Sequence, residues 1–143
     1  MTIAIDTRIH IAAPRSIVWG ALTDWSRAHE WMPEATDMRQ TSEPLSVGTV
    51  LAFRAQKSER ISTVEALDPG SMIGLASEGP GVHAVYTYTL EDAVGGTDVR
   101  LVADVETRGA MKMLGPTIRS SIAKADGGQL EALAAMVSRS PAV

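Results

Sequence analysis

The sequence offers few residues whose types and spacing could carry out acid–base, nucleophilic or metal chemistry. Its three histidines, His10, His29 and His83, lie far apart and form no H-E-x-x-H pair. The chain has no cysteine, which excludes a thiolate nucleophile and a cysteine-ligated metal. Ser121 and Lys124 fit the S-x-x-K pattern of serine acyl-enzymes, but the S-D-N and K-T-G partner motifs are absent. We therefore expect no metal and no cofactor, and the pattern identifies no catalytic residue.

Nucleotide and nucleic-acid binding find equally little support. The segment Gly79–Gly81 lacks the third glycine of a dinucleotide-binding fingerprint, and neither a phosphate-binding loop nor a G-x-S-x-G motif is present. The formal net charge is −4, without a local cluster of lysine or arginine. Nucleic-acid-binding proteins usually carry a basic surface. We therefore expect no nucleic-acid partner.

Aromatic residues at strand spacing are better candidates, and the chemistry they suggest is binding. Tyr86 and Tyr88 are two residues apart, so in a strand their side chains point to the same face. If that face is inward, their hydroxyls need hydrogen-bond partners or a wet cavity. Phe53, together with Leu51, is expected on the inner face of another strand. Ordinary core packing is the alternative for the tyrosines and the favoured role for Phe53, which stays a candidate ligand contact.

A long amphipathic helix is predicted for Arg108–Arg139, near the end of the chain. At about 100° per residue, one apolar stripe contains Met111, Leu114, Ile118, Ile122, Ala125, Leu133 and Met136. Lys124 lies on the opposite, polar face. The stripe also includes Gln129, which is expected to bond a backbone group, with a ligand contact as the alternative. In the first half of the helix, Met111, Leu114, Ile118 and Ile122 are candidate ligand contacts, and a core role is equally compatible with the pattern.

Two glycine-containing pairs occur in this segment, one at the expected start of the helix and one in its interior. Gly115-Pro116 indicates its start, because proline is tolerated in a first helical turn, and Met111 to Leu114 could form a separate turn before it. Gly127-Gly128 lies inside the helix and costs about 1 kcal/mol per glycine relative to alanine. A helix with this pair needs a partner surface to stabilise it.

That surface is predicted to be a sheet, since period-two patterns dominate the preceding chain. Six strands are expected, at Ile3–Ile11, Thr49–Ala55, Arg60–Leu67, Ser71–Ser77, Val82–Glu91 and Thr97–Thr107. Two short helices are expected after the first strand, at Pro14–Leu22 and Ser26–Trp31, with Pro33 ending the second. Residues 34–47 are polar and are expected to be irregular. Glu59, Arg60, Glu106 and Arg108 are expected on solvated faces.

The three tryptophans have two readings. Trp19, Trp25 and Trp31 could line a cavity or its entrance, or Trp19 and Trp31 could wedge the short helices against the long one. We favour the wedge, because large aromatic side chains most often bury area for stability.

Length and composition favour one α+β domain over residues 1–143. Of the 143 residues 45% are hydrophobic, and no repeat or linker interrupts the pattern. The elements predict a curved antiparallel sheet wrapped around the long C-terminal helix. No apolar run approaches the roughly 18 residues of a membrane span, and the N-terminal residues do not read as a signal peptide. A cytoplasmic location is therefore expected, and a homodimer is left open.

Several local motifs accompany this order of elements. They are Ala13-Pro14, Val18-Trp19, Leu22, Asp24 and Trp31 with Pro33 within Ile11–Pro33, and then Val47-Gly48-Thr49, Val64 with Asp68-Pro69, Gly96-Thr97 and Gly115-Pro116. Together they resemble the START-like or SRPBCC superfamily with its helix-grip fold, and in particular its polyketide cyclase/dehydrase and lipid-transport group. The resemblance implies an internal cavity between sheet and helix, roofed by the N-terminal half of the helix and suited to a small apolar molecule.

Three functions are compatible with this resemblance. The first is binding, either carriage or sequestration, of a small hydrophobic or aromatic ligand. The second is a polyketide cyclase/aromatase or dehydrase, which would need an inward acid or base. The third is a protein-binding module similar to activators of heat-shock chaperones. Because no inward constellation of His, Asp or Arg is evident, binding is favoured over catalysis.

Overall fold

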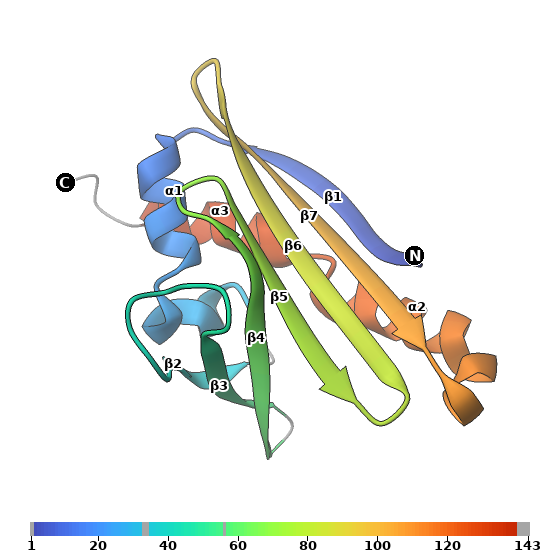
Figure 1. Cartoon of the computed structure of the whole chain (residues 1–143). Coiled ribbons are helices and arrows are strands. Elements are labelled where there is room, and N and C mark those ends of the chain that lie inside the picture. The colour runs from blue at the N-terminus through green and yellow to red at the C-terminus, as the bar shows by residue number, and fades with distance from the viewer. Residues whose placement is uncertain (1, 33–34, 56, 140–143) are drawn as a thin grey trace.

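The strands form a curved antiparallel sheet that wraps around the C-terminal helices (Figure 1). The computed structural model describes residues 2–32, 35–55 and 57–139, and within these residues one seven-stranded sheet has the order β1-β7-β6-β5-β4-β3-β2. The strands are β1 (Ile3–Ile11), β2 (Thr36–Gln40), β3 (Val50–Ala55), β4 (Ser58–Asp68), β5 (Met72–Gly79), β6 (Val82–Ala93) and β7 (Gly96–Thr107). The predicted helix-grip arrangement is confirmed.

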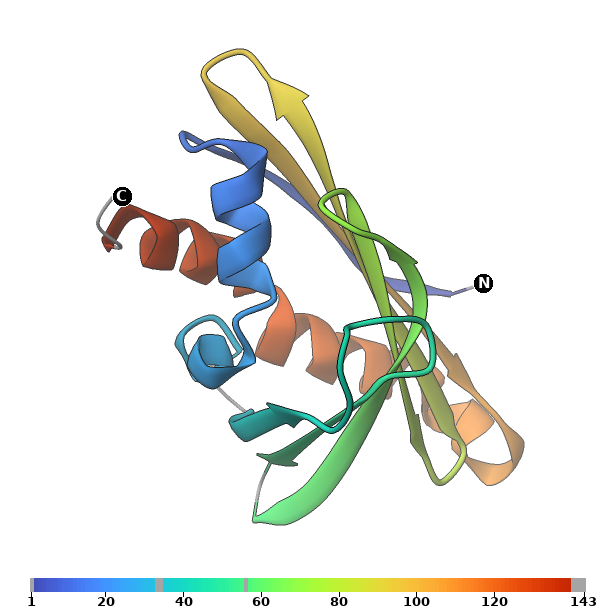
Figure 2. The ribbon, with the colours of Figure 1, turned by 60° about the vertical axis from the view of Figure 1, so that its left-hand side comes forward.

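The helices lie in two groups. After β1 come α1 (Arg15–Leu22) and the 3-10 helix η1 (Trp25–Glu30), as expected for two short helices. After β7 come the 3-10 helix η2 (Gly109–Leu114), α2 (Gly115–Asp126) and α3 (Gln129–Arg139). Figure 2 shows α2 and α3 crossing the concave side of the sheet, where both contact β1 and β7. Pro33, which was expected to end the second short helix, lies outside the described residues.

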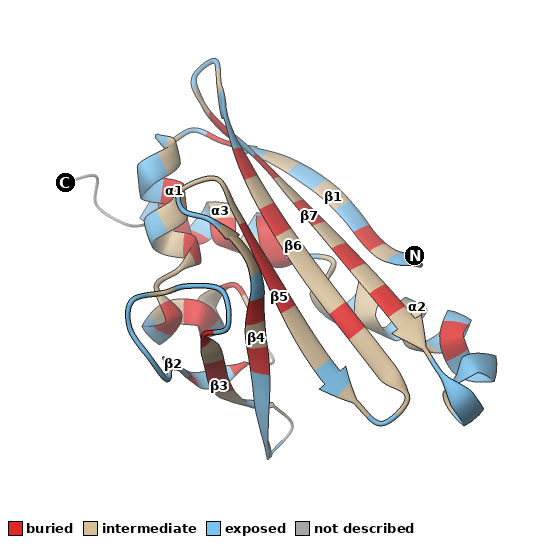
Figure 3. Cartoon of the chain, in the orientation of Figure 1, coloured by how far each residue is buried: buried red, intermediate tan, exposed pale blue. Residues whose placement is uncertain are grey.

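Alternation of side chains between the two faces of the sheet explains why these strands form here. In β7, Val99, Leu101, Ala103 and Val105 are buried at every second position. Figure 3 shows separate buried bands along β6 as well, where Ala84, Tyr88 and Leu90 are buried. The inner face carries the apolar set, so a shift of one residue in register would expose all of it. The sheet is therefore held in register by the same pattern that predicted it.

The segment 34–47 was expected to be irregular, and this expectation is wrong for residues 36–40. They form β2, an edge strand that pairs with β3. Only Met38 of its five residues is buried, and Asp37 has a positive φ of 53°. The pairing register also shifts between Thr36 and Arg39. A short, polar and irregular edge strand has no period-two pattern to detect.

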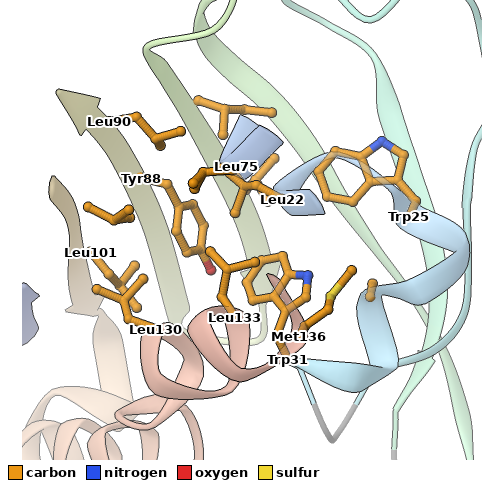
Figure 4. Packing of buried hydrophobic residues seen from close by; sticks show 14 of the residues in the cluster. Leu22, Trp25, Trp31, Leu75, Tyr88, Leu90, Leu101, Leu130, Leu133 and Met136 are labelled. Carbon is orange, nitrogen blue, oxygen red and sulfur yellow. The ribbon is translucent and has the colours of Figure 1, made fainter. Parts of the chain in front are cut away.

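The apolar core lies between the sheet, α1, η1 and α3 (Figure 4). Trp31 is fully buried at the end of η1, and its ring meets the ring of Tyr88 edge-on, with centroids 5.5 Å apart. Such an edge-to-face pair adds to the stabilisation from burial. Trp25 is also buried, whereas Trp19 is only half-buried. Trp31 therefore contributes more than Trp19 to the expected wedge.

The predicted apolar stripe of the C-terminal helix is only partly buried. Leu133 and Met136 are fully buried, but Leu114 is 49% exposed and Ala125 is exposed. Residues 109–114 form a 3-10 helix, whose three residues per turn do not continue the phase of α2. The chain then turns at Gly127-Gly128, between α2 and α3. A single helical wheel therefore could not describe the whole segment.

Candidate functional site

A pocket of about 380 Å³ lies between the inner face of β3 to β6 and the end of α2. Its apolar lining comes from Met32, Ala35, Met38, Phe53, Ala55, Leu75, Ala84, Ile122 and Ala125, together with the rings of Tyr86 and Tyr88. Ala125 is exposed although it lines the pocket, and so are Arg60 and Ser121. The pocket therefore opens to solvent beside these three residues and is closed by the core at the other end.

Strand pairing places the sheet side of the pocket. Phe53 on β3 pairs with Arg60 on β4, and Leu75 on β5 pairs with Tyr86 on β6. Directly paired residues of an antiparallel sheet present their side chains on the same face. The pocket wall is therefore built from alternate residues of four neighbouring strands, and its shape follows from the register.

The helix side of the pocket depends on the turn between α2 and α3. Ile122 and Asp126 lie one turn apart on α2, and Gln129 is the first residue of α3. At the turn, Gly127 donates its N–H to the carbonyl of Ala123 at 2.9 Å. A Cβ at position 127 would lie only 2.4 Å from that same carbonyl oxygen, so this position has no room for a side chain. The glycine thus permits the turn that brings Asp126 and Gln129 to one wall.

A chain of hydrogen bonds joins the sheet to this turn. The Tyr88 hydroxyl donates to Oε1 of Gln129 at 2.5 Å, and the Tyr86 hydroxyl donates to Oδ2 of Asp126. Nε2 of Gln129 donates to Oδ1 of Asp126 at 3.3 Å. Gln129 is only 3% exposed, and Figure 4 shows the Tyr88 hydroxyl directed toward α3. Both tyrosine hydroxyls therefore have the partners that burial requires, and Gln129 bonds side chains where a backbone partner was expected.

Burial keeps both tyrosines protonated. Loss of hydration raises the pKa of Tyr86 far above its ordinary value, and the negative charge of Asp126 raises it further. Burial likewise raises the pKa of Tyr88 well above its ordinary value, with smaller contributions from Tyr86 and Asp126. The two phenols are therefore hydrogen-bond donors to the helix, and their oxygens keep lone pairs that can accept from another group.

The predicted ligand contacts divide into two sets. Phe53, Tyr86, Tyr88 and Ile122 come together around the pocket. Met111, Leu114 and Ile118 do not line it. The second set lies farther along, toward the start of α2 and in η2.

Met111 shows what the second set does. Its side chain packs over Gly81 in the β5–β6 turn, where an added Cβ would lie 2.6 Å from Met111 Cγ. Gly81 also has a φ of +72°, which favours glycine. Met111 thus fastens η2 to the sheet.

Sequence reasoning missed the polar residues of the pocket. Arg60 was expected to be solvated and is exposed, but it lies on the inner face of β4, which it shares with the buried residues Ser62 and Val64. Its even spacing from Val64 was the signal that could have placed it. Asp126 carried no such signal, because its direction depends on the turn at Gly127.

Other features of the described residues are weaker candidates for a functional site than this pocket. A hollow of about 470 Å³ lies on the convex side, over β1, β6 and β7. Polar side chains of this hollow already have protein partners: His10 lies 2.8 Å from Asp98, and Arg100 forms an ion pair with the adjacent Asp6 at 2.8 Å. Among the described residues, no cluster of His, Cys, Asp or Glu could hold a metal ion. The described helices also include none with the length and apolarity to cross a membrane.

The sequence matches one family model over most of its length. Residues 2–137 match the family described as polyketide cyclase / dehydrase and lipid transport. No curated protein matches the sequence.

Solved structures share the fold at low sequence identity. The Zhui aromatase/cyclase from Streptomyces sp. R1128 is similar with a TM-score of 0.77 and 18% identity, over 94% of this chain and 92% of that chain. Ara h 8.0201 has a TM-score of 0.75 and 15% identity, over 94% and 97% of the two chains. Protein MLL2253 from Mesorhizobium loti has a TM-score of 0.71 and 21% identity, over 96% and 98%.

Proposed function

The chain belongs to the polyketide cyclase/dehydrase and lipid-transport family, and we propose that it binds a small hydrophobic or aromatic molecule in the pocket beneath α2. One observation carries the proposal: a pocket of about 380 Å³ with a mostly apolar wall extends from the surface toward the core of the fold. Small-molecule sites typically have volumes of roughly 300–1,000 Å³, apolar walls and a few placed polar groups. Tyr86, Asp126 and Gln129 supply such groups here.

A pocket inside the fold supports a small ligand over a protein partner. A protein-binding module would present an apolar groove on its surface, whereas Met38 and Leu75 line this pocket at 8% and 6% exposure. The Zhui protein is an aromatase/cyclase with the same fold, which shows that this fold is compatible with catalysis as well as with binding. A cytoplasmic location stays a prediction from the sequence, which left a homodimer open.

Catalysis as a cyclase or dehydrase is the second candidate, and the Tyr86–Asp126 pair favours it. A phenol bonded to a carboxylate inside an apolar pocket can move a proton at a bound substrate. In that case Asp126→Asn would abolish turnover of a poly-β-carbonyl substrate analogue while the variant still bound a neutral apolar probe. If the wild-type protein binds the analogue and leaves it unchanged, binding alone is the function.

A blocked entrance tests the binding proposal. Ala125 is an exposed residue at the mouth of the pocket, so Ala125→Trp places an indole in the opening with little cost to the fold. Ala135 is exposed on α3 and does not line the pocket, so Ala135→Trp is the matched control. Binding of N-phenyl-1-naphthylamine is measured by its fluorescence.

The two variants should separate clearly. Ala125→Trp should lower the affinity for the probe by roughly tenfold, which corresponds to about 1.4 kcal/mol of binding free energy. Ala135→Trp should bind the probe as tightly as the wild type does. Equal affinities for all three proteins would show that the probe does not enter this pocket.

A further inference from the structure

Arg60 is a charged residue on the inner face of the sheet, beside Phe53 on the facing strand. It lies near the start of β4, lines the pocket and is exposed at its mouth. Among the residues that the structure describes, none forms an ion pair or hydrogen bond with its guanidinium. An arginine has five N–H donors in a planar fork that fits a carboxylate with two parallel bonds. Arg60 therefore brings a positive charge to the mouth of a mostly apolar pocket.

The neighbouring carboxylate does not supply a partner. Glu59 precedes Arg60 and points to the opposite, convex face of the sheet, because side chains alternate along a strand. There it binds two other arginines, Arg39 and Arg54, each at 3.3 Å. On the convex face of this hairpin, cations are thus paired with a carboxylate. On the concave face, no carboxylate of the described residues forms an ion pair with Arg60.

Asp126 lies across the same pocket and limits where a second negative charge could bind. Its carboxylate already accepts hydrogen bonds from Tyr86 and Gln129. An anionic group of a ligand would be repelled at that end and attracted at the Arg60 end. Arg60 and Asp126 would therefore orient a ligand with one negative charge so that its anionic group lies at the Arg60 end of the pocket.

A pair of serines lies deeper than Arg60 on the same face. Ser62 is 7% exposed, and its hydroxyl lies 2.8 Å from the hydroxyl of Ser77 on β5. One of these hydroxyls donates to the other, so the second hydrogen remains to be donated. The sheet thus offers one spare hydroxyl donor deeper than Arg60, on either Ser62 or Ser77.

We propose that the pocket takes an amphipathic acid, with its apolar or aromatic body between Phe53, Leu75 and Ile122 and its carboxylate bound by Arg60 at the mouth. This inference rests on the proposed function and names the ligand class of the same pocket.

The test compares an acid with its neutral analogue. Octanoate and 1-octanol share one apolar chain and differ in the head group, and each is titrated as a competitor of N-phenyl-1-naphthylamine. Wild type, Arg60→Gln and the control Arg54→Gln are compared at low and high salt. Arg54 precedes Arg60 by six residues on the facing strand and lies on the convex side, so its removal deletes the same charge outside the pocket.

Arg60→Gln should lower the affinity for octanoate by about five- to tenfold, which is in the range for a hydrogen bond to a charged group at a partly exposed site. The affinity for 1-octanol should stay within about twofold of the wild-type value. Added salt should lower the affinity of the wild type for octanoate and have little effect on the affinity of Arg60→Gln for octanoate. Arg54→Gln should behave as the wild type with both compounds.

Other results would overturn the inference in distinguishable ways. If 1-octanol competes but Arg60→Gln changes both compounds equally, or neither, the acid preference is wrong and the apolar pocket stands. The same conclusion follows if Arg54→Gln reproduces the loss for octanoate. If the folded wild type binds neither the probe nor either competitor, the proposed function fails and this inference fails with it.

Discussion

Tyr86 and Tyr88 are the only tyrosines of the chain, and both point their hydroxyls at the turn between α2 and α3. Their raised pKa values make an experiment possible that reports on the pocket alone. In the unfolded chain both phenols ionise near a pH of about 10, the ordinary pKa of a tyrosine. In the folded protein burial keeps both neutral well above that pH.

A spectrophotometric titration should therefore show no tyrosinate until the protein unfolds. Below a pH of about 10 both states hold their phenolic protons, so this contribution to stability is complete. Above it the unfolded chain releases protons that the folded chain retains, and the free energy of unfolding falls as the pH rises. Tyr86→Phe and Tyr88→Phe should each halve the absorbance change. Ionisation of either phenol near pH 10 while circular dichroism stays native would contradict the buried network.

Residues of the pocket differ in how far the sequence could predict them. Tyr86, Tyr88 and Phe53 followed from two-residue spacing, because alternation places side chains on a face without knowledge of the fold. The position of Arg60 was decided by its phase relative to buried Val64, and the charge itself had suggested solvent. Asp126 could not be placed, since its partner Tyr86 is forty residues away in sequence and meets it only after the sheet has formed.

At the scale of elements, the turn at Gly127-Gly128 positions the pocket's polar wall. The two glycines meet different surroundings. A Cβ on Gly127 would lie 2.4 Å from the Ala123 carbonyl oxygen, whereas a Cβ on Gly128 would meet nothing within 4 Å. Alanine at 127 must therefore shift the end of α2, and alanine at 128 fits the turn as it is.

Gly127→Ala and Gly128→Ala should consequently have opposite effects on stability. Gly127→Ala should lower the free energy of unfolding by about 1–3 kcal/mol, as strained insertions do. Gly128→Ala should leave it unchanged or raise it by up to about 1 kcal/mol, because alanine restricts the unfolded chain. Urea unfolding of the two variants measures both values. Equal losses would show that the turn does not have this geometry.

Elements with a strong period were predictable, and those shaped by tertiary contacts were not. The alternating strands and the apolar stripe of α3 matched expectation. The edge strand β2 did not, because its bulge and its polar residues hide any period. The stripe failed in η2, where packing of Met111 over Gly81 decides which side chains face inward.

For the molecule as a whole, the order of elements was sufficient to predict the helix-grip fold, since a sheet with one apolar face must curve around the helices that cover it. The volume left between the two layers was not predictable. It depends on how side chains of α2 and β3 to β6 fill the space, and those contacts join residues remote in sequence. The central claim, an apolar ligand inside this space, therefore needs a measurement that locates the ligand.

Methionine methyl groups provide that measurement. Of the seven methionines, Met32 and Met38 line the pocket, and Met113 is 92% exposed on η2. In a protein with ¹³C-labelled methionine methyls, titration with N-phenyl-1-naphthylamine should shift the Met32 and Met38 signals through the ring current of the bound probe and leave Met113 in place. Shifts at Met113 with unmoved Met32 and Met38 signals would contradict the account, because the probe would then lie on the surface and not beneath α2.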